Sequence, residues 1–425
     1  MNANAKCPAS AARSDVGVIF NPLDPEQIED PYPIYARARR EEPVFYSDQF
    51  DVWVVTRYED LCTVLRDPER FSSVGALETK PDLPPEVVAV LEKGYVKALS
   101  LVQSDPPDHT RMRNVFNHVF SPQCVAAMEP QIRAIANELI DGFETDGMAD
   151  LISQFAFPLP GIVICELLGV PRSDLPQIKL WSNAKQVMMS ATETPEKMVE
   201  HAYDFVALQH YFREHIERRA KEPKDDLLTL LVPAEIGGTA PLSMQESVCN
   251  AMDLLAAGHE TATDLIGNGL ALLIDHPKQM ADLRADPTLG PKALEEILRM
   301  EAPVRGLFRR VTTTVELGRV TLQPGTRLFV LYGSGNHDEA EFPRADEFDI
   351  HRRKEEPRHL SFSKGIHYCV GSALARLEGR VAFELLLKRL PNVRRDPTRK
   401  AVRRPYIILR GFEYLPIVWD TAPSA

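Results

Sequence analysis

Apolar positions recur every three or four residues along most of this chain, and that spacing is typical of amphipathic helices. The clearest case begins at Ser243, where Ser243 and Glu246 form a capping-box pattern, and it runs to the stop signal Asp275-His276-Pro277. A helix of that span would be about 48 Å long at 1.5 Å per residue. The pattern therefore predicts one helix that crosses the whole molecule.

Shorter elements are expected on both sides of this helix. Helices are predicted from Pro31 to about Arg40, from Asp105 to about Phe120, and from Pro291 to before Pro303. Strands are predicted at residues 44–46, 52–56, 315–317, 320–322, 327–331, 406–409 and 415–419. The run Pro81-Asp-Leu-Pro-Pro predicts an irregular loop near residues 74–104. We expect a mobile tail at residues 1–18 and one mainly α domain with a minor β portion over residues 19–425.

Composition narrows the protein class. Among the 425 residues, 44% are hydrophobic and 26% charged, which is an ordinary globular balance. The formal net charge of −12 argues against non-specific binding to nucleic acid. No apolar run reaches the roughly 18–20 residues that span a bilayer, and Met1 to Asp15 is polar, so we expect a cytoplasmic monomer without signal peptide or membrane anchor. The six cysteines contain no C-x-x-C pair, which disfavours a disulfide framework or zinc ribbon.

The segment Phe362-Ser-Lys-Gly365-Ile-His367-Tyr-Cys369-Val-Gly371 is the most informative in the chain. Phe362 can shield a sulfur, while Gly365 and Gly371 permit bends and close backbone approach. The predicted helix that follows points its positive end at Cys369, so we expect a lowered pKa for this thiol. A single cysteine beside a helix start is usually a buried structural residue. The surrounding spacing instead favours a loop that presents one sulfur to a metal.

The middle of the long helix contains a second unusual segment, Ala257-Gly258-His-Glu260-Thr261-Ala. A glycine inside a helix costs about 1 kcal/mol relative to alanine, so Gly258 indicates either room for a ligand or close helix packing. Glu260 and Thr261 are an adjacent acid and alcohol that can deliver protons. The segment also begins like a zinc-protease helix, but Thr263 stands where that motif requires a second histidine.

Together these segments resemble the motifs of the cytochrome P-450 family. The cysteine segment resembles that family's haem loop, F-x-x-G-x-x-x-C-x-G, and the helix segment is similar to its A-G-x-[DE]-T-[ST] signature, with Ala262 replacing the last hydroxyl residue. Glu296-Ile-Leu-Arg299 resembles the family's E-x-x-R, and Phe348-Asp-Ile-His-Arg352 resembles the segment that supplies a second arginine. The resemblance extends from about Asp24 to Trp419.

The resemblance implies a cytochrome P-450-like fold that holds haem b between the long central helix and the helix after the cysteine loop. Cys369 is then expected to bind the haem iron, Thr261 to stabilise bound oxygen and Glu260 to relay protons. The Glu296, Arg299 and Arg352 side chains are expected to form a structural network. The other positions implied to contact haem are Ala257, Gly258, Phe362, Gly365, Gly371 and the propionate partners His109, Arg113, Arg309 (or Arg310) and His367.

The implied activity is a monooxygenase that inserts one atom of O2 into a small or medium hydrophobic substrate, by hydroxylation or O-dealkylation. There is no G-x-G-x-x-G and no P-loop, so electrons from NAD(P)H are expected to arrive through a separate ferredoxin and reductase. Lys364, Arg376 and Arg380 are candidates for a basic ferredoxin dock or for an ordinary solvated helix face. Two alternatives are a hydrogen-peroxide-driven peroxygenase and a non-catalytic haem sensor or carrier.

The substrate pocket is expected from several separate segments of apolar character. Arg305, within one of them, is expected to face solvent. The segments are residues 74–104, residues 181–189, the long helix near Leu254 and Ala257, Val304–Leu307, and Gly411-Phe412.

Overall fold

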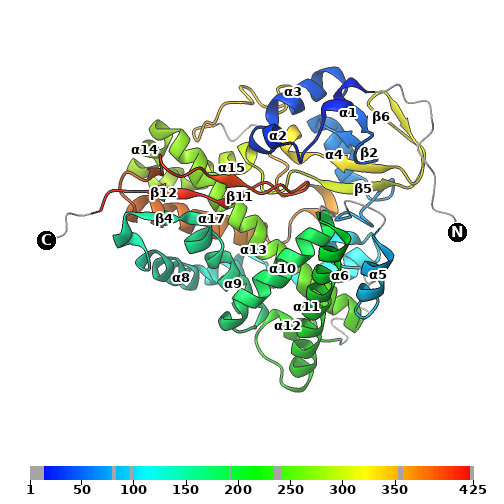
Figure 1. Ribbon diagram of the computed structural model, residues 1–425, viewed down its shortest axis with the longest axis horizontal. Helices are drawn as coiled ribbons and strands as arrows, with labels where there is room; N and C mark the ends of the chain where they lie inside the picture. The colour runs from blue at the N-terminus through cyan, green and yellow to red at the C-terminus, as the bar shows by residue number, and fades with distance from the viewer. Residues whose placement is uncertain are drawn as a thin grey trace.

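The computed structural model describes residues 14–78, 83–95, 99–190, 193–233, 241–352 and 358–421. Helices form most of the molecule, and α13 (Met244–Asp275) passes through their middle (Figure 1). The α-helices are α1 (Asp15–Ile19), α2 (Pro25–Glu29), α3 (Tyr32–Glu41), α4 (Tyr58–Arg66), α5 (Pro85–Leu91), α6 (Asp108–Asn117), α7 (Pro122–Ala127), α8 (Glu129–Asp141), α9 (Pro158–Leu168), α10 (Leu175–Ser190), α11 (Pro195–Lys221), α12 (Leu227–Leu230), α13, α14 (Pro277–Ala285), α15 (Gly290–Met300), α16 (Tyr332–Gly335) and α17 (Ser372–Arg389).

Helix α13 is the long helix that the capping pattern predicts. The Ser243 hydroxyl accepts from the Glu246 N–H, and the Glu246 carboxylate accepts from the Ser243 N–H, so the capping box is complete. Helices α9, α11, α15 and α17 all contact α13. A side chain at Gly269 would bring its Cβ to 2.3 Å from the Phe383 ring of α17, so glycine permits this close approach. No helix in the described ranges is long and apolar enough to cross a bilayer.

The strands form four small sheets beside the helices, and the larger sheet lies with α1 and α3 on one side of the molecule (Figure 1). Its order is β1-β2-β8-β5-β3, with β2 and β8 parallel and the other neighbours antiparallel. The parallel pairing places Trp53 opposite Leu328 and so joins segments far apart in sequence. The strands are β1 (Val44–Ser47), β2 (Val52–Val55), β3 (Phe71–Ser72), β4 (Met148–Asp150), β5 (Leu307–Val311), β6 (Val315–Leu317), β7 (Val320–Leu322), β8 (Arg327–Val330), β9 (Arg394–Arg395), β10 (Val402–Arg403), β11 (Phe412–Tyr414) and β12 (Pro416–Val418).

The mainly α class with a minor β portion is confirmed, but several local predictions are wrong. Residues 15–19 form α1 rather than part of a mobile tail, because Val16 is fully buried in the N-terminal core; residues 1–13 lie outside the described ranges. Residues 74–104 contain α5, which begins at Pro85, a residue that suits a first helical position. Residues 406–409 form no strand, although Leu409 makes an isolated bridge with Val304.

Arg305 is also placed differently from the prediction. It is only 2% exposed, and its guanidinium donates to the Pro22 carbonyl at 3.2 Å. The prediction of a solvent-facing Arg305 is therefore wrong, because the N-terminal segment covers this arginine.

The predicted network of Glu296, Arg299 and Arg352 is present and almost completely buried. Arg299 binds Glu296 through two hydrogen bonds of 2.8 Å, and the Arg352 Nε donates to Glu296 at 3.0 Å. The Asp349 N–H donates to the same carboxylate at 3.0 Å. A buried carboxylate with this many donors is satisfied, whereas either arginine without it would be a buried unpaired charge.

Replacing Glu296 with alanine is expected to lower the free energy of unfolding by about 3–5 kcal/mol, the usual effect of removing one partner from a buried ion pair. The matched control is Glu347→Ala, which removes an exposed partner of Arg344 and should change stability by no more than about 1 kcal/mol. Denaturant unfolding of both variants measures the difference. Equal effects would contradict a structural role for Glu296.

Candidate active site

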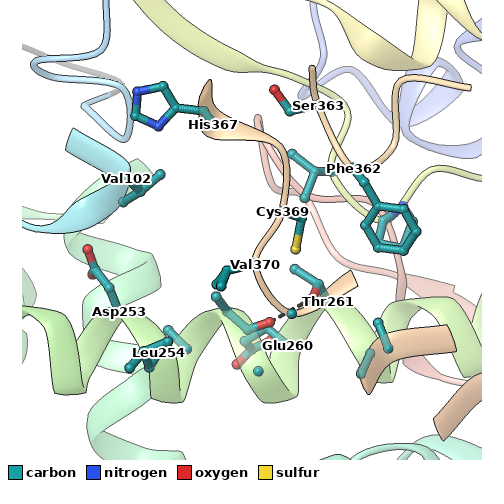
Figure 2. Close-up of a pocket in the computed structure, with 18 of the residues that line it drawn as sticks. Val102, Asp253, Leu254, Glu260, Thr261, Phe362, Ser363, His367, Cys369 and Val370 are labelled. Atoms are coloured by element: carbon teal, nitrogen blue, oxygen red, sulfur yellow. Dashed lines mark hydrogen bonds between the residues drawn. The ribbon is translucent and has the colours of Figure 1, made fainter. Parts of the chain in front are cut away.

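A continuous cavity lies between α13 and the loop before α17. In Figure 2 the Cys369 sulfur points toward the face of α13 that carries Glu260 and Thr261. The residues that line the cavity include Leu77, Leu101, Val102, Arg113, Leu254, Ala257, Gly258, Glu260, Thr261, Val304, Leu307, Arg309, Phe362, His367, Cys369, Gly371, Ile408 and Leu409.

The cysteine loop is held in place by its backbone. The Cys369 N–H donates to the Phe362 carbonyl at 2.9 Å, which closes the loop on itself. Gly365 has a φ of +69°, and a Cβ there would lie 2.3 Å from the Leu65 carbonyl oxygen of α4. Only glycine satisfies both conditions, so this position fixes how closely the loop approaches α4.

Phe362 and its neighbours close one side of the cavity. The Phe362 side chain is 8% exposed, and the Arg376 guanidinium lies 4.4 Å from the centre of its ring. Arg376 is itself fixed by hydrogen bonds of 2.6 and 3.0 Å to Glu295. Phe362 is thus held beside the cysteine loop, and its shielding of the sulfur stays a prediction.

The predicted lowering of the Cys369 pKa is wrong for the protein without a bound cation. Burial raises the pKa of the thiol, and the Gly371 N–H together with Arg113 and Arg376 offsets this only in part. A coordinated metal cation deprotonates a thiol directly, so the sulfur remains a suitable metal ligand.

On the α13 side, Ala257, Gly258, Glu260 and Thr261 all line the cavity. The Thr261 hydroxyl donates to the Ala257 carbonyl at 2.7 Å, so in this rotamer it offers the cavity an acceptor. A Cβ at Gly258 would lie 2.8 Å from the side chain of Ile164 on α9. Of the two explanations for Gly258, close helix packing is therefore the one with a measured contact.

Glu260 is nearly fully buried and bound from two sides. Its Oε1 lies 3.2 Å from His259 Nε2, and its Oε2 accepts from Arg404 at 2.7 Å. Burial raises the pKa of Glu260, but His259 and Arg404 outweigh that effect and lower the pKa to about 2. Arg404 also binds Asp264, one helical turn after Glu260. Neither Arg404 nor Asp264 was predicted from the sequence. The available signal for Asp264 was a second acid on the apolar face of the helix.

Cationic and imidazole groups gather at another part of the cavity. Arg113, Arg309 and His367 line it, and the ring centre of His109 lies 4.3 Å from that of His367. Arg309 is 4% exposed and lines the cavity, whereas Arg310 does not, so the structure favours Arg309; its contact with a propionate stays a prediction. In the described ranges, Nε2 of both His109 and His367 is buried without a hydrogen-bond partner.

This group of side chains fits an anionic ligand. Burial above all, and then Arg309, His109 and Arg113, lower the pKa of His367 to about 2, so its ring is neutral and Arg309 and Arg113 carry the positive charge here. Two carboxylates placed among these groups would pair with them and satisfy the unpaired ring nitrogens. The residues present therefore fit haem, whose iron accepts one sulfur ligand and whose propionates are two carboxylates.

The proposed substrate-lining segments are confirmed in part. Residues 77, 101 and 102, the α13 positions and Val304–Leu307 contribute, with Arg305 among the exceptions. Gly411-Phe412 does not line the cavity, because Phe412 packs beneath the Arg403 guanidinium at 4.1 Å. No described side chain of residues 181–189 lines it either.

Each side chain of the candidate basic dock has a partner within the chain. Lys364 donates to the Tyr58 hydroxyl at 3.0 Å, and Arg380 binds Glu129 at 2.6 Å. Arg376 binds Glu295, as described above. These three side chains therefore brace neighbouring elements, and their charge is less available to a partner than the sequence indicated.

Known proteins share this architecture. A family model described as Cytochrome P-450 matches residues 173–392. Cytochrome P-450 107B1 of Saccharopolyspora erythraea is 38% identical over 398 residues, covering 92% of this chain and 95% of that protein. The 6-deoxyerythronolide B hydroxylase of the same organism is 36% identical over 400 residues, covering 92% and 96%. The structure of cytochrome P-450 CREJ in complex with (4-ethylphenyl) dihydrogen phosphate has a TM-score of 0.89 and 30% identity, covering 95% of this chain and 100% of that chain.

Replacing Gly365 with alanine is expected to destabilise the protein by at least about 1–2 kcal/mol, the usual cost of a left-handed conformation for a residue with a Cβ. The contact with the Leu65 carbonyl adds to this cost. Gly290→Ala is the control, because nothing lies within 4 Å of its Cβ and its φ is not positive. Thermal or denaturant unfolding compares the two; a stable Gly365→Ala protein would contradict the described loop geometry.

Proposed function

This chain belongs to the cytochrome P-450 family and is a monooxygenase, and we propose that Cys369 is the residue through which it binds its haem. Members of the family bind haem b through a cysteine thiolate. Cys369 is the cysteine that lines the cavity, whereas the other described cysteines, Cys62, Cys124, Cys165 and Cys249, do not. Its sulfur pointing into a cavity that also gathers Arg113, Arg309 and the unpartnered ring nitrogen of His367 is the single observation that carries this proposal.

The chain's own residues would fix the cofactor from opposite sides. Arg113, Arg309 and His367 would hold the propionates, with His109 behind His367, while Ala257 and Gly258 form the facing wall. When bound and reduced, haem with a thiolate ligand supplies the activation of O2 that monooxygenation requires.

Glu260 and Thr261 would manage protons in the cavity. Glu260 is ionised at neutral pH, because its pKa is about 2. It must therefore accept a proton before it can donate one, and it acts as a relay rather than a store. Thr261, whose oxygen is open to the cavity, lies beside it on α13.

We propose a hydrophobic substrate of small or medium size that is hydroxylated or O-dealkylated. Apolar side chains contribute much of the cavity lining, among them Leu77, Leu101, Val102, Leu254 and Ile408. Two relatives are named as a 6-deoxyerythronolide B hydroxylase and a mycinamicin IV hydroxylase/epoxidase, which supports oxidation of an organic molecule.

Electrons are proposed to come from a ferredoxin that docks over the cysteine loop. Tyr368 precedes Cys369 and is 36% exposed, one of the exposed large side chains of the molecule. Arg113 donates to the Tyr368 carbonyl at 2.7 Å, and Arg376 lies 3.2 Å from its hydroxyl. An exposed aromatic ring that these contacts hold in place suits the centre of a small interface with a partner protein.

The reduced protein treated with carbon monoxide is expected to show the red-shifted absorption band of thiolate-ligated haem. Cys369→Ser should abolish that band, because it removes the sulfur. Cys124→Ser, at a cysteine on α7 outside the cavity, should leave the band unchanged. A normal band in Cys369→Ser would overturn the assignment, and product formed with hydrogen peroxide but not with ferredoxin would indicate a peroxygenase instead.

Tyr368→Ser is expected to raise the apparent KM for ferredoxin about fivefold or more, because truncating a central interface aromatic usually costs more than about 1 kcal/mol. The dissociation constant of the substrate should not change. Tyr203→Ser is the control, since Tyr203 is a 51% exposed tyrosine on α11. Steady-state kinetics with varied ferredoxin tests this; equal KM values for all three proteins would place the dock elsewhere.

A further inference from the structure

His259, Glu260, Asp264 and Arg404 form a buried cluster behind the cavity wall. His259 and Asp264 are 1% and 0% exposed, and Glu260 is 3% exposed. Arg404 comes from the segment after β10, and its side chain is 15% exposed. The cluster thus joins α13 to a part of the chain that is about 140 residues away, as the Arg404–Asp264 hydrogen bond shows.

The geometry of His259 requires a proton between it and Glu260. Nδ1 of His259 lies 2.7 Å from the Leu255 carbonyl oxygen, which can only accept, so Nδ1 carries a hydrogen. A neutral imidazole then has a lone pair on Nε2, which lies 3.2 Å from the Glu260 carboxylate. Two acceptors would repel at this distance. A second proton, on either Nε2 or the carboxylate, converts the contact into a hydrogen bond.

The net charge of the cluster also requires one additional proton. Arg404 contributes one positive charge, while Glu260 and Asp264 each contribute a negative charge when ionised. Arg403 does not balance the excess, because Arg403 and Arg410 form a separate group with the two carboxylates of Glu29 and Glu301. A buried cluster with net charge is unfavourable, so one additional proton makes this cluster neutral.

Asp264 has the surroundings of a group that holds such a proton. Its Oδ1 binds Arg404, but its Oδ2 is buried without a hydrogen-bond partner in the described part of the chain. The groups that face it are Glu260 on its own helix and Arg403, Arg404 and Tyr406 from the segment that begins at β10. Burial raises the pKa of Asp264 to about 7, against the effect of Arg404.

The approach of the second segment is built into the sequence. A Cβ at Gly411 would overlap the Asp264 carboxylate, so a glycine is needed for the chain to pass so close. The Arg404 N–H donates to the Gly411 carbonyl at 3.1 Å, which holds the arginine over α13. The backbone at Gly411 and Arg404 therefore fixes the cluster in place, and the cluster is not a chance contact of long side chains.

We propose that His259, Asp264 and Arg404 are positioning residues that keep one exchangeable proton beside Glu260 and pass it to the Glu260 carboxylate for delivery into the cavity next to Thr261. In this transfer the proton leaves His259 Nε2 or the Asp264 carboxyl and binds Glu260, which then releases it. A proton from solvent then returns to the group that lost it, His259 Nε2 or the Asp264 carboxylate; Arg404, which stays protonated, is the partly exposed member of the cluster and marks its side nearest to solvent. This inference rests on the proposed function, since it supplies the protons that a monooxygenase consumes.

The decisive variant is Asp264→Asn, which removes one negative charge and keeps the hydrogen bond between Arg404 and Glu260. The cluster is then neutral without the additional proton. In substrate-free holoenzyme at pH 6, infrared spectroscopy reports a protonated carboxyl, and nitrogen NMR of labelled histidine reports a hydrogen on His259 Nε2. The wild type should show one of these signals. Asp264→Asn should lack both, because His259 Nε2 can then turn from Glu260 toward the Ser182 hydroxyl, which lies 3.4 Å away and can donate to it. The difference spectrum cancels the signal of Glu378, another buried acid, whose pKa burial raises to about 8.

The same variant has an expected effect on stability that does not depend on turnover. The pKa of Asp264 is higher in the folded protein than its ordinary value of 3.8, so between about pH 4 and 7 the folded state binds the additional proton. The free energy of unfolding of the wild type should therefore decrease relative to that of Asp264→Asn as the pH rises through this range. Denaturant midpoints of the two proteins at pH 5 and pH 8 measure the change.

Turnover provides the functional readout. In the wild type, product formed per electron pair consumed should fall as the pH rises above about 7, when the proton is lost. In Asp264→Asn it should be low at every pH, with the product rate reduced about 100-fold, the lower end of the range for general acid–base groups. Asp264→Glu should restore part of the wild-type pH profile. Asp226→Asn is the control, because Asp226 is a buried acid bound to Arg219, not to Glu260 or Arg404.

Three results would overturn the inference. One is the absence of both spectroscopic signals in the wild type. Another is their persistence in Asp264→Asn, and the third is a wild-type pH profile in that variant. Failure of the proposed function is distinguishable, because the carbon monoxide band would then be missing from the wild type as well. If Asp264→Asn does not fold, Asp264→Ser, which removes the same negative charge and keeps Arg404, replaces it in the spectroscopic comparison.

Discussion

The buried carboxylate of Glu296 fixes the path of the chain that leads to the cysteine loop. It positions Arg299, whose guanidinium donates to the carbonyls of Asn336 at 2.9 Å and Ala345 at 2.6 Å. The Asn336 side chain in turn accepts from the Leu360 N–H at 2.6 Å. Leu360 lies two residues before Phe362, whose carbonyl binds the Cys369 N–H. A series of buried hydrogen bonds thus connects one carboxylate to the position of the sulfur.

This arrangement explains why the cavity can remain open. Haem-sized space between α13 and the loop would otherwise collapse, because apolar side chains gain free energy by packing together. The loop is prevented from approaching α13 by contacts on its other side, where Gly365 meets α4 and Phe362 meets Arg376. The unpaired ring nitrogens of His109 and His367 mark the part of the cavity where the protein is incomplete without an anionic ligand.

Sequence reasoning succeeded where the signal was local. The capping box and period of α13, the glycines around Cys369 and the i, i+3 pair of Glu296 and Arg299 all depend on nearby positions. It failed where a distant segment decided the outcome. Arg305 is buried by the N-terminal segment, and Arg404 reaches Glu260 from about 140 positions away, so neither contact leaves a pattern in its own neighbourhood. Arg309 and Arg310 differ only in which face of β5 they occupy, and the sheet determines that.

The short segment from Gly258 to Thr261 shows why a motif can be found in sequence before its roles can be assigned. Consecutive residues of a helix are about 100° apart around its axis, so four of them face four different surroundings. Gly258 faces α9, His259 lies near Ser182 of α10, Glu260 meets Arg404, and Thr261 opens to the cavity. Each identity in the segment answers to a different neighbour. The chemistry of Glu260 is therefore set by side chains that a motif does not contain. The same four residues in another chain can thus bind and release protons differently.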